Sequence, residues 1–166
     1  MATEEPVYTI VRSFAAPRDL LWRAWTETAL LAKWFGPKGV TMRVKAHDLR
    51  PGGVLHSSMT TPDGTVMWAR FDYREVDPPH LLSWVHGFSD EAGARQPAPF
   101  PGDFPPEMLT TVRFIDKGAT SEIVLTWQPI APTDAERAGF IAAMEGFDMG
   151  WGGSFEQLDD LFAELA

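Results

Sequence analysis

Four histidines are the side chains of this sequence best suited to acid–base chemistry or metal binding: His47, His56, His80 and His86. Their spacing contains no His-x-His or His-x-x-x-His pair, so a zinc or iron site would need ligands from separate strands. Carboxylates such as Asp48 or Asp72 would have to complete it. The sequence therefore predicts neither a metal site nor a cofactor.

His86 belongs to an aromatic face, because Leu82, Trp84, His86 and Phe88 alternate along one predicted strand. On such a face we expect a hydrogen-bonded core or pocket residue rather than a metal ligand. With Tyr73, His86 would form the one acid–base pair that the sequence offers inside a core.

Nucleophilic catalysis has little support in the sequence. There is no cysteine and no Gly-x-Ser-x-Gly turn, so the possible nucleophiles are reduced to hydroxyl groups. The run Gly150-Trp151-Gly152-Gly153 follows no strand and lacks Gly-Lys-Ser/Thr, so we expect it to pack a helix against a sheet rather than to hold a phosphate. No residue is assigned a catalytic role.

The charge balance excludes one class of partner. The chain has 14 Lys and Arg against 23 Asp and Glu, a net charge of −9, and binding to nucleic acid depends on neutralising phosphates with basic side chains. The N-terminus is acidic, and no run of 18 apolar residues occurs. We expect a cytoplasmic protein without a membrane span, monomeric or homodimeric, that does not bind nucleic acid.

The elements that would position these residues follow from hydrophobic periodicity and turn chemistry. A strand is predicted over 7–14, a short helix after Pro17, and a second with Thr28 as its N-cap and a stop at Gly36–Pro37. Period-two segments separated by Pro-Gly and Asp-Gly turns predict six antiparallel strands. They lie near 40–49, 54–60, 66–76, 81–88, 108–115 and 121–128.

A long amphipathic helix is predicted from Thr133, where Thr133 and Glu136 have the form of a capping box. Glycine costs about 1 kcal/mol relative to Ala inside a helix, and this helix contains five. Either it breaks near 150–153, or its backbone closely approaches another segment there. The apolar face comprises Phe140, Met144, Phe147, Trp151, Phe155, Leu158, Phe162 and Leu165.

A proline-rich loop is predicted at about 89–106, resembling neither a strand nor a helix. It contains two aromatic residues, Phe100 and Phe104, which we expect to be exposed. Exposed aromatic rings favour burial against another surface, so Phe100 and Phe104 are candidates for a lid or a partner contact. A plain connecting loop is the alternative.

Several motifs, spread over nearly the whole chain, together resemble one family. They are Ala16-Pro17-x-x-Leu20-Leu21-Trp22-x-Ala24-Trp25-Thr26, Leu31-x-x-Trp34-Phe35-Gly36-Pro37, Asp48-Leu49-Arg50-Pro51-Gly52-Gly53, Pro62-Asp63-Gly64, Tyr73-Arg74-Glu75-Val76-Asp77-Pro78-Pro79, and Met144-x-x-x-x-Met149-Gly150-Trp151-x-x-Ser154-Phe155-x-x-Leu158-x-x-Leu161. The pattern resembles the heat-shock-protein-90 ATPase activator homologue branch of the START/Bet v 1-like (SRPBCC) superfamily.

The resemblance implies an α+β helix-grip fold as a single domain over residues 1–166. Its curved antiparallel seven-stranded sheet, two short helices and one long C-terminal helix would follow in β-α-α-β6-α order. Sheet and helix would enclose a hydrophobic cavity. Alternation within that fold assigns to the cavity Ala69, Phe71, Tyr73, Leu82, Trp84, His86, Val112, Phe114, Met144, Phe147, Trp151 and Phe155.

Three functions are compatible with the resemblance. The first is non-catalytic binding of a hydrophobic or aromatic small molecule. This function would explain why the chain contains seven Trp and eleven Phe, because they could line the binding cavity. The second is a co-chaperone that contacts the heat-shock-protein-90 chaperone and stimulates its ATPase. The third is a cyclase- or aromatase-like enzyme, which would depend on His86 and Tyr73.

Overall fold

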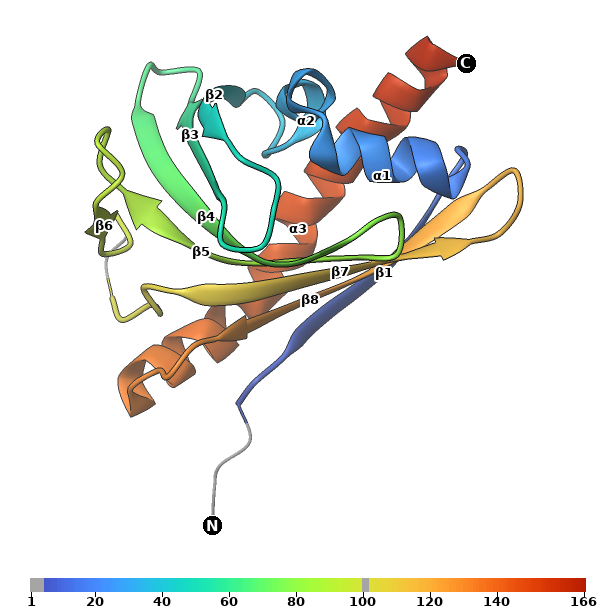
Figure 1. Cartoon of the computed structure of the whole chain (residues 1–166). Coiled ribbons are helices and arrows are strands. Elements are labelled where there is room, and N and C mark those ends of the chain that lie inside the picture. Colours follow the sequence, from blue (N-terminus) through green and yellow to red (C-terminus); the bar gives the residue numbers. More distant parts are fainter. Residues whose placement is uncertain (1–4, 100–101) are drawn as a thin grey trace.

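The computed structural model describes residues 5–99 and 102–166 and consists of one curved antiparallel sheet with a long helix across it (Figure 1). The α+β helix-grip fold is confirmed. The elements are β1 (Tyr8–Phe14), α1 (Arg18–Thr26), α2 (Thr28–Trp34), β2 (Thr41–His47), β3 (Val54–Thr60), β4 (Val66–Asp77), β5 (Leu81–Ser89), β6 (Arg95–Gln96), β7 (Met108–Asp116), β8 (Ser121–Pro129) and α3 (Asp134–Leu165).

The sheet order is β1-β8-β7-β5-β4-β3-β2, with β6 added beside β5. Because β1 and β2 are opposite edges of the sheet, the chain must cross its full width between them, and α1 and α2 make that crossing (Figure 1). The seven long strands match the predicted ones. In the predicted irregular loop, however, Arg95 and Gln96 pair with Ser89 and Phe88, so the loop contributes a short strand.

Two helix starts were predicted from capping chemistry, and one is wrong. Glu27, not Thr28, is the N-cap of α2, without a side-chain hydrogen bond. Thr28 is the first helical residue, and its hydroxyl lies 2.7 Å from His47 Nδ1. The capping box of α3 is confirmed, because the Glu136 N–H donates to Thr133 Oγ1 at 3.1 Å and the Thr133 N–H donates to Glu136 Oε1 at 2.9 Å.

Trp25 of α1 lies at the centre of the core and is 1% exposed. Its ring centroid is 4.8 Å from that of Trp34 in α2, and 6.0 Å from both Trp84 in β5 and Trp151 in α3. Trp22, one turn earlier, packs edge-on against Phe114 at 5.2 Å. One short helix therefore joins the sheet, α2 and α3 through two indole rings.

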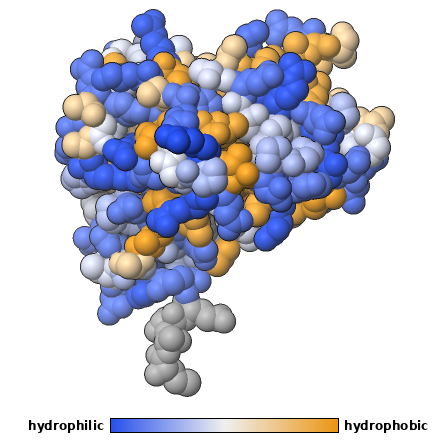
Figure 2. Space-filling model, viewed as in Figure 1, coloured by the Kyte–Doolittle hydropathy of each residue, from blue (hydrophilic) through white to orange (hydrophobic). Residues whose placement is uncertain are grey.

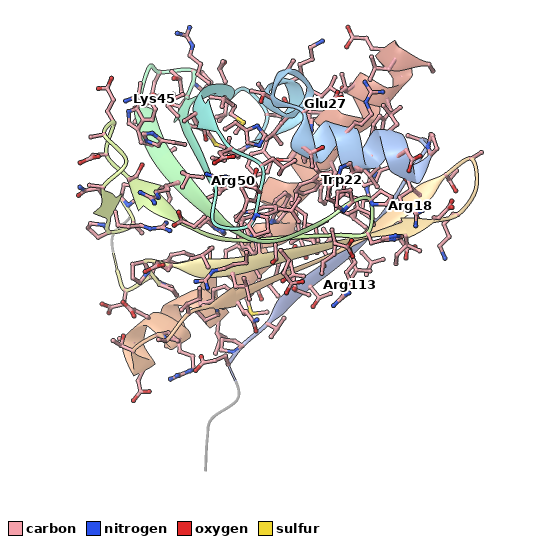
Figure 3. All side chains as sticks on the ribbon, in the orientation of Figure 1. Arg18, Trp22, Glu27, Lys45, Arg50 and Arg113 are labelled. Carbon is pink, nitrogen blue, oxygen red and sulfur yellow. The ribbon has the colours of Figure 1, made fainter. Side chains whose placement is uncertain are left out.

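The surface is predominantly polar on the face shown in Figure 2, where hydrophobic residues show near the middle and in smaller groups toward the edges. Lys45, Arg50 and Arg113 are exposed and extend away from the core (Figure 3). Arg12 of β1 contacts Asp159 of α3 at 2.7 Å and ties the helix to that edge of the sheet. Within the described residues, no helix is both long and apolar enough to cross a membrane.

Helix α3 is continuous from Asp134 to Leu165, so the predicted break near 150–153 does not occur. Of the predicted stretch, Gly153 lies in ordinary contact with the Lys38 backbone, since a Cβ there would be 3.6 Å from the Lys38 nitrogen, and the tightest approach on α3 is at Gly139. A Cβ on Gly139 would be 1.7 Å from the Asp103 carbonyl oxygen, whereas one on Gly150 would have no neighbouring atom within 4 Å. Gly139 lets the loop before β7 pack onto α3, and Gly150 leaves a space open.

Alanine substitutions on α3 test this difference. We expect Gly139→Ala to lower the free energy of unfolding by about 1–3 kcal/mol, because the added methyl group displaces the 103–104 backbone. Gly152→Ala is the matched control, since its Cβ meets no atom within 4 Å, and it should stabilise the protein by about 0.5–1 kcal/mol. Urea denaturation measures both, and a Gly139→Ala protein as stable as the Gly152→Ala protein would contradict the packing.

Candidate functional site

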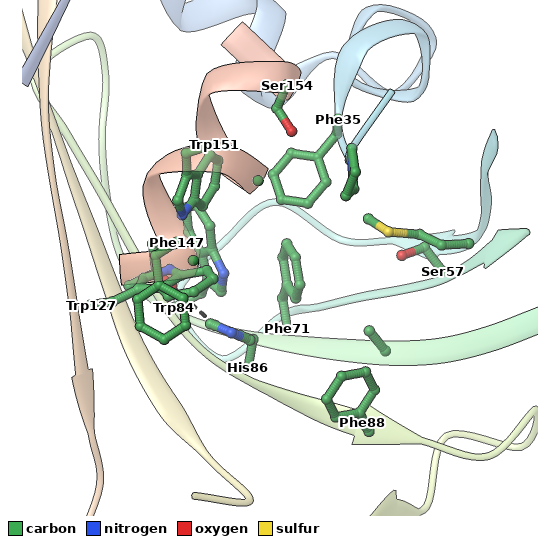
Figure 4. A pocket seen from close by; sticks show the side chains of 17 residues that line it. Phe35, Ser57, Phe71, Trp84, His86, Phe88, Trp127, Phe147, Trp151 and Ser154 are labelled. Carbon is green, nitrogen blue, oxygen red and sulfur yellow. Dashed lines mark hydrogen bonds between the residues drawn. The ribbon is translucent and has the colours of Figure 1, made fainter. Parts of the chain in front are cut away.

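A cavity of about 260 Å³ lies between α3 and the sheet (Figure 4). Its walls are mainly aromatic and aliphatic, with few polar side chains. The lining residues are Phe35, Gly36, Pro37, Ser57, Met59, Ala69, Phe71, Trp84, His86, Phe88, Thr110, Trp127, Gly146, Phe147, Gly150, Trp151 and Ser154.

On the helix side, small residues of α3 border the cavity beside the rings of Phe147 and Trp151. Gly146, Gly150 and Ser154 stand four residues apart and therefore share one side of α3. A Cβ on Gly146 or Gly150 would meet no atom within 4 Å. At these small residues α3 leaves space next to the sheet, and this space forms part of the cavity.

The sheet side is built from rings on adjacent strands. Phe71 of β4 stacks on Trp84 of β5, with centroids 5.2 Å apart and planes inclined by 12°. Trp127 of β8 lies 5.0 Å from Phe147 and 5.4 Å from Trp151, both of α3. These rings form flat, apolar surfaces that suit a planar ligand.

His86 supplies the titratable group of the cavity. Its ring lies 5.7 Å from Phe71 and 5.3 Å from Trp127, and its Nδ1 is 3.0 Å from the hydroxyl oxygen of the buried Thr110 (Figure 4). Burial lowers the pKa of His86 from 6.5 to about 4, and the positive charge of Arg95 acts in the same direction. His86 is therefore a neutral imidazole at physiological pH.

Three indole N–H groups around the cavity, those of Trp84, Trp127 and Trp151, are buried and have no hydrogen-bond partner within the part of the chain that the structure describes. Each of the three rings packs against another ring of the cluster. Weak N–H···π contacts are the interactions available to such covered donors.

Tyr73 and His86 do not form the predicted acid–base pair. The Tyr73 hydroxyl is 3.0 Å from His47 Nε2, and His47 Nδ1 in turn contacts Thr28. Burial raises the pKa of Tyr73 above its usual value and lowers that of His47. Tyr73 thus links β4 to β2 and α2, and it does not line the cavity.

Half of the twelve residues assigned to the cavity from the sequence line it: Ala69, Phe71, Trp84, His86, Phe147 and Trp151. The others are displaced for identifiable reasons. Leu82, Val112 and Phe114 are buried in the core, where α1 packs on the sheet and Trp22 contacts Phe114. Phe155 packs on Phe14 and Trp34, and Met144 packs half-buried against the core.

The environment of Phe104, one of the two predicted lid residues, differs from the expected one. Phe104 is half-buried rather than exposed, and its ring lies 6.5 Å from Phe140 and 6.4 Å from Phe147. It therefore supports Phe147 from outside the cavity instead of lining the cavity itself. Phe100 lies outside the described residues.

Some lining residues could have been found from the sequence. Thr110 and Trp127 continue the alternation of Val112 and Leu125 on neighbouring strands, and Phe88 follows His86 on the same face. Phe35, Gly36 and Pro37 carry no such signal, because their position depends on how the turn after α2 packs on α3. Among the described residues, no three His, Asp or Glu side chains form a group that could hold a metal ion.

Comparison with known proteins defines the class. The curved sheet gripping a long helix around an apolar cavity is the architecture of START/Bet v 1-like domains. Residues 15–163 match the family described as Activator of Hsp90 ATPase homolog 1-like protein, and the chain belongs to that family. No curated protein matches the sequence.

Solved structures extend the comparison to nearly the whole chain. A Mycobacterium smegmatis protein is 27% identical with a TM-score of 0.73, and the match covers 93% of this chain and 89% of that one. An Arthrobacter aurescens protein is 25% identical with a TM-score of 0.78, covering 95% and 86%. The AHSA1 protein of Silicibacter pomeroyi, at 19% identity and a TM-score of 0.74, covers 97% and 100% and shares the fold.

The lowered pKa of His86 predicts acid sensitivity. Between pH 6.5 and 4 the unfolded chain binds a proton at His86 that the folded protein does not, so stability falls as the pH falls. From pH 7 to pH 5 the loss attributable to His86 should be roughly 2 kcal/mol. Urea denaturation at the two pH values measures it, with His86→Phe as the comparison protein.

The same prediction has a direct spectroscopic check. In an NMR titration, the His86 ring resonances should remain those of a neutral imidazole down to about pH 5. A His86 that titrates near 6.5, or a His86→Phe protein with the same pH dependence as the wild type, would contradict the assignment.

Proposed function

We propose that the chain acts as one domain that binds a hydrophobic or aromatic small molecule, without catalysis, in the cavity between α3 and the sheet. The observation that carries this proposal is the glycine wall of the cavity. Gly146 and Gly150 each weaken α3 by about 1 kcal/mol relative to Ala, although a methyl group would fit at both positions without a clash. A helix under selection for stability alone would fill this space.

The volume limits the size of the ligand. An apolar cavity of about 150 Å³ is sufficient for one benzene molecule. The 260 Å³ cavity therefore suits a molecule of one substituted ring or two fused rings. Its flat aromatic walls favour a planar skeleton over a flexible chain.

A cyclase- or aromatase-like role has less support than binding. The pair on which it would depend is separated, since Tyr73 bonds to His47, and His86 contacts Thr110. His86 alone, with its pKa lowered to about 4, would be a weak general base at neutral pH.

Filling the cavity from α3 tests the binding proposal. We expect naphthalene and 1-naphthol to bind the wild-type protein and to shift amide resonances of the lining residues. Gly150→Leu should weaken this binding on the order of tenfold or more, because the isobutyl group occupies the ligand's space.

Gly152→Leu is the matched control, since residue 152 lies two positions along the same helix and does not line the cavity. It should retain wild-type affinity. Equal affinities of the two variants would contradict the proposed site, and no binding of any bicyclic aromatic compound to the wild type would overturn the function.

A second candidate function rests on the family description, which names activation of the Hsp90 ATPase. The purified chain, added to heat-shock-protein-90 chaperone in a steady-state ATPase assay, should then raise the rate in a concentration-dependent manner. Gly150→Leu should stimulate as well as the wild type if the chaperone contacts the outer surface. An unchanged ATPase rate would remove this candidate.

A further inference from the structure

The accessible polar atom of His86 is its second ring nitrogen. Nδ1 is engaged by Thr110, whereas no hydrogen bond joins Nε2 to any described residue. His86 retains partial exposure and lines the cavity, as Figure 4 shows for its ring between Phe71 and Trp127. Nε2 is therefore the polar contact that the cavity offers a bound molecule at this end.

Thr110 determines which nitrogen carries the proton. Its side chain is 0% exposed, and within the described residues the partner of its hydroxyl group is His86 Nδ1. A buried hydroxyl hydrogen without an acceptor is costly. Thr110 must therefore donate to Nδ1, so that Nδ1 is unprotonated and the single proton of the imidazole resides on Nε2.

The surroundings of Nε2 favour an uncharged acceptor. Phe71, Trp84 and Trp127 line this end, and the indole N–H groups of Trp84 and Trp127 are buried. A carboxylate placed here would lose its hydration and gain one donor, which does not compensate for burying the charge. The nearby cation, Arg95, is engaged by Asp72.

We propose that the cavity selects compact, planar aromatic compounds that carry a carbonyl oxygen, and that this oxygen accepts a hydrogen bond from His86 Nε2–H. The inference rests on the proposed binding function and adds the class of ligand. The rings of the bound compound would occupy the space between the aromatic side chains of the sheet and the glycines of α3. Thr110 is a positioning residue that acts through the tautomer of His86.

A matched pair of compounds tests the proposal. 1-Tetralone and tetralin share a bicyclic skeleton and differ in the ketone, so we expect 1-tetralone to bind the wild-type protein about fivefold to tenfold more tightly, the contribution of one neutral hydrogen bond. His86→Phe keeps a ring at this position and should abolish the preference while retaining tetralin binding. 1-Naphthoate should bind no better than naphthalene.

The possible results separate the two proposals. If neither tetralin nor 1-tetralone binds, the binding function itself fails. If both bind the wild type with equal affinity, or if 1-naphthoate binds more tightly than naphthalene, binding stands and the carbonyl preference is wrong. A preference for 1-tetralone that persists in His86→Phe overturns the role of His86.

The histidine tautomer gives a test that does not depend on the variant folding. In ¹⁵N-labelled wild-type protein, Nε2 of His86 should have the chemical shift of a protonated ring nitrogen and Nδ1 that of an unprotonated one, and 1-tetralone should shift the Nε2 resonance. Thr110→Ser should preserve this tautomer, and Thr110→Val should release it. A proton on Nδ1 in the wild type overturns the proposal.

Discussion

The position of Trp25 determines how close α3 can lie to the sheet. Its indole ring stands between Trp84 of β5 and Trp151 of α3, with 6.0 Å between centroids on each side. Trp25 therefore packs against both helix and sheet at this point. Trp84 and Trp151 also line the cavity, and Trp25 does not. The cavity lies beside this cluster, and its lining includes no residue of α1.

The cavity contains few polar groups because aromatic rings occupy much of its wall. Rings from β4, β5, β8 and α3 surround His86, and desolvation by burial keeps the imidazole neutral. A single hydroxyl group, from Thr110, accounts for one nitrogen. The proposed site would distinguish ligands by shape and by few hydrogen bonds, because a buried ion has no counter-charge within it.

The order of elements could be predicted from the sequence because the determinants are local. Pro51, Gly52 and Gly64 mark turns, alternation marks strands, and Thr133 with Glu136 marks the start of α3. Alternation also identifies which strand residues face inward. It does not distinguish Phe71 and Trp84, which line the cavity, from Val112 and Phe114, which face the same way under α1. That distinction depends on where Trp22 packs, a contact between segments about 90 residues apart in sequence.

The histidine partners were unpredictable for the same reason. Tyr73 and His86 face the same interior, but Tyr73 has a nearer partner in His47, which reaches it from β2 across the width of β3. The glycines of α3 are unusual in a helix, but the sequence allows more than one explanation for them. Gly139 accommodates a neighbouring backbone, and Gly150 borders empty space. Two glycines on one helix therefore have different structural roles, and only their three-dimensional surroundings distinguish these roles.

The glycines with which α3 borders the cavity have an evolutionary consequence. Two positions on α3, Gly146 and Gly150, limit the cavity on the helix side, and a Cβ at either would meet no atom within 4 Å. One-step changes to Ala, Ser or Val at these positions would shorten the chamber in increments, each with a gain in helix propensity. Descendants of such a scaffold can diverge in what they accept while their folding determinants stay the same.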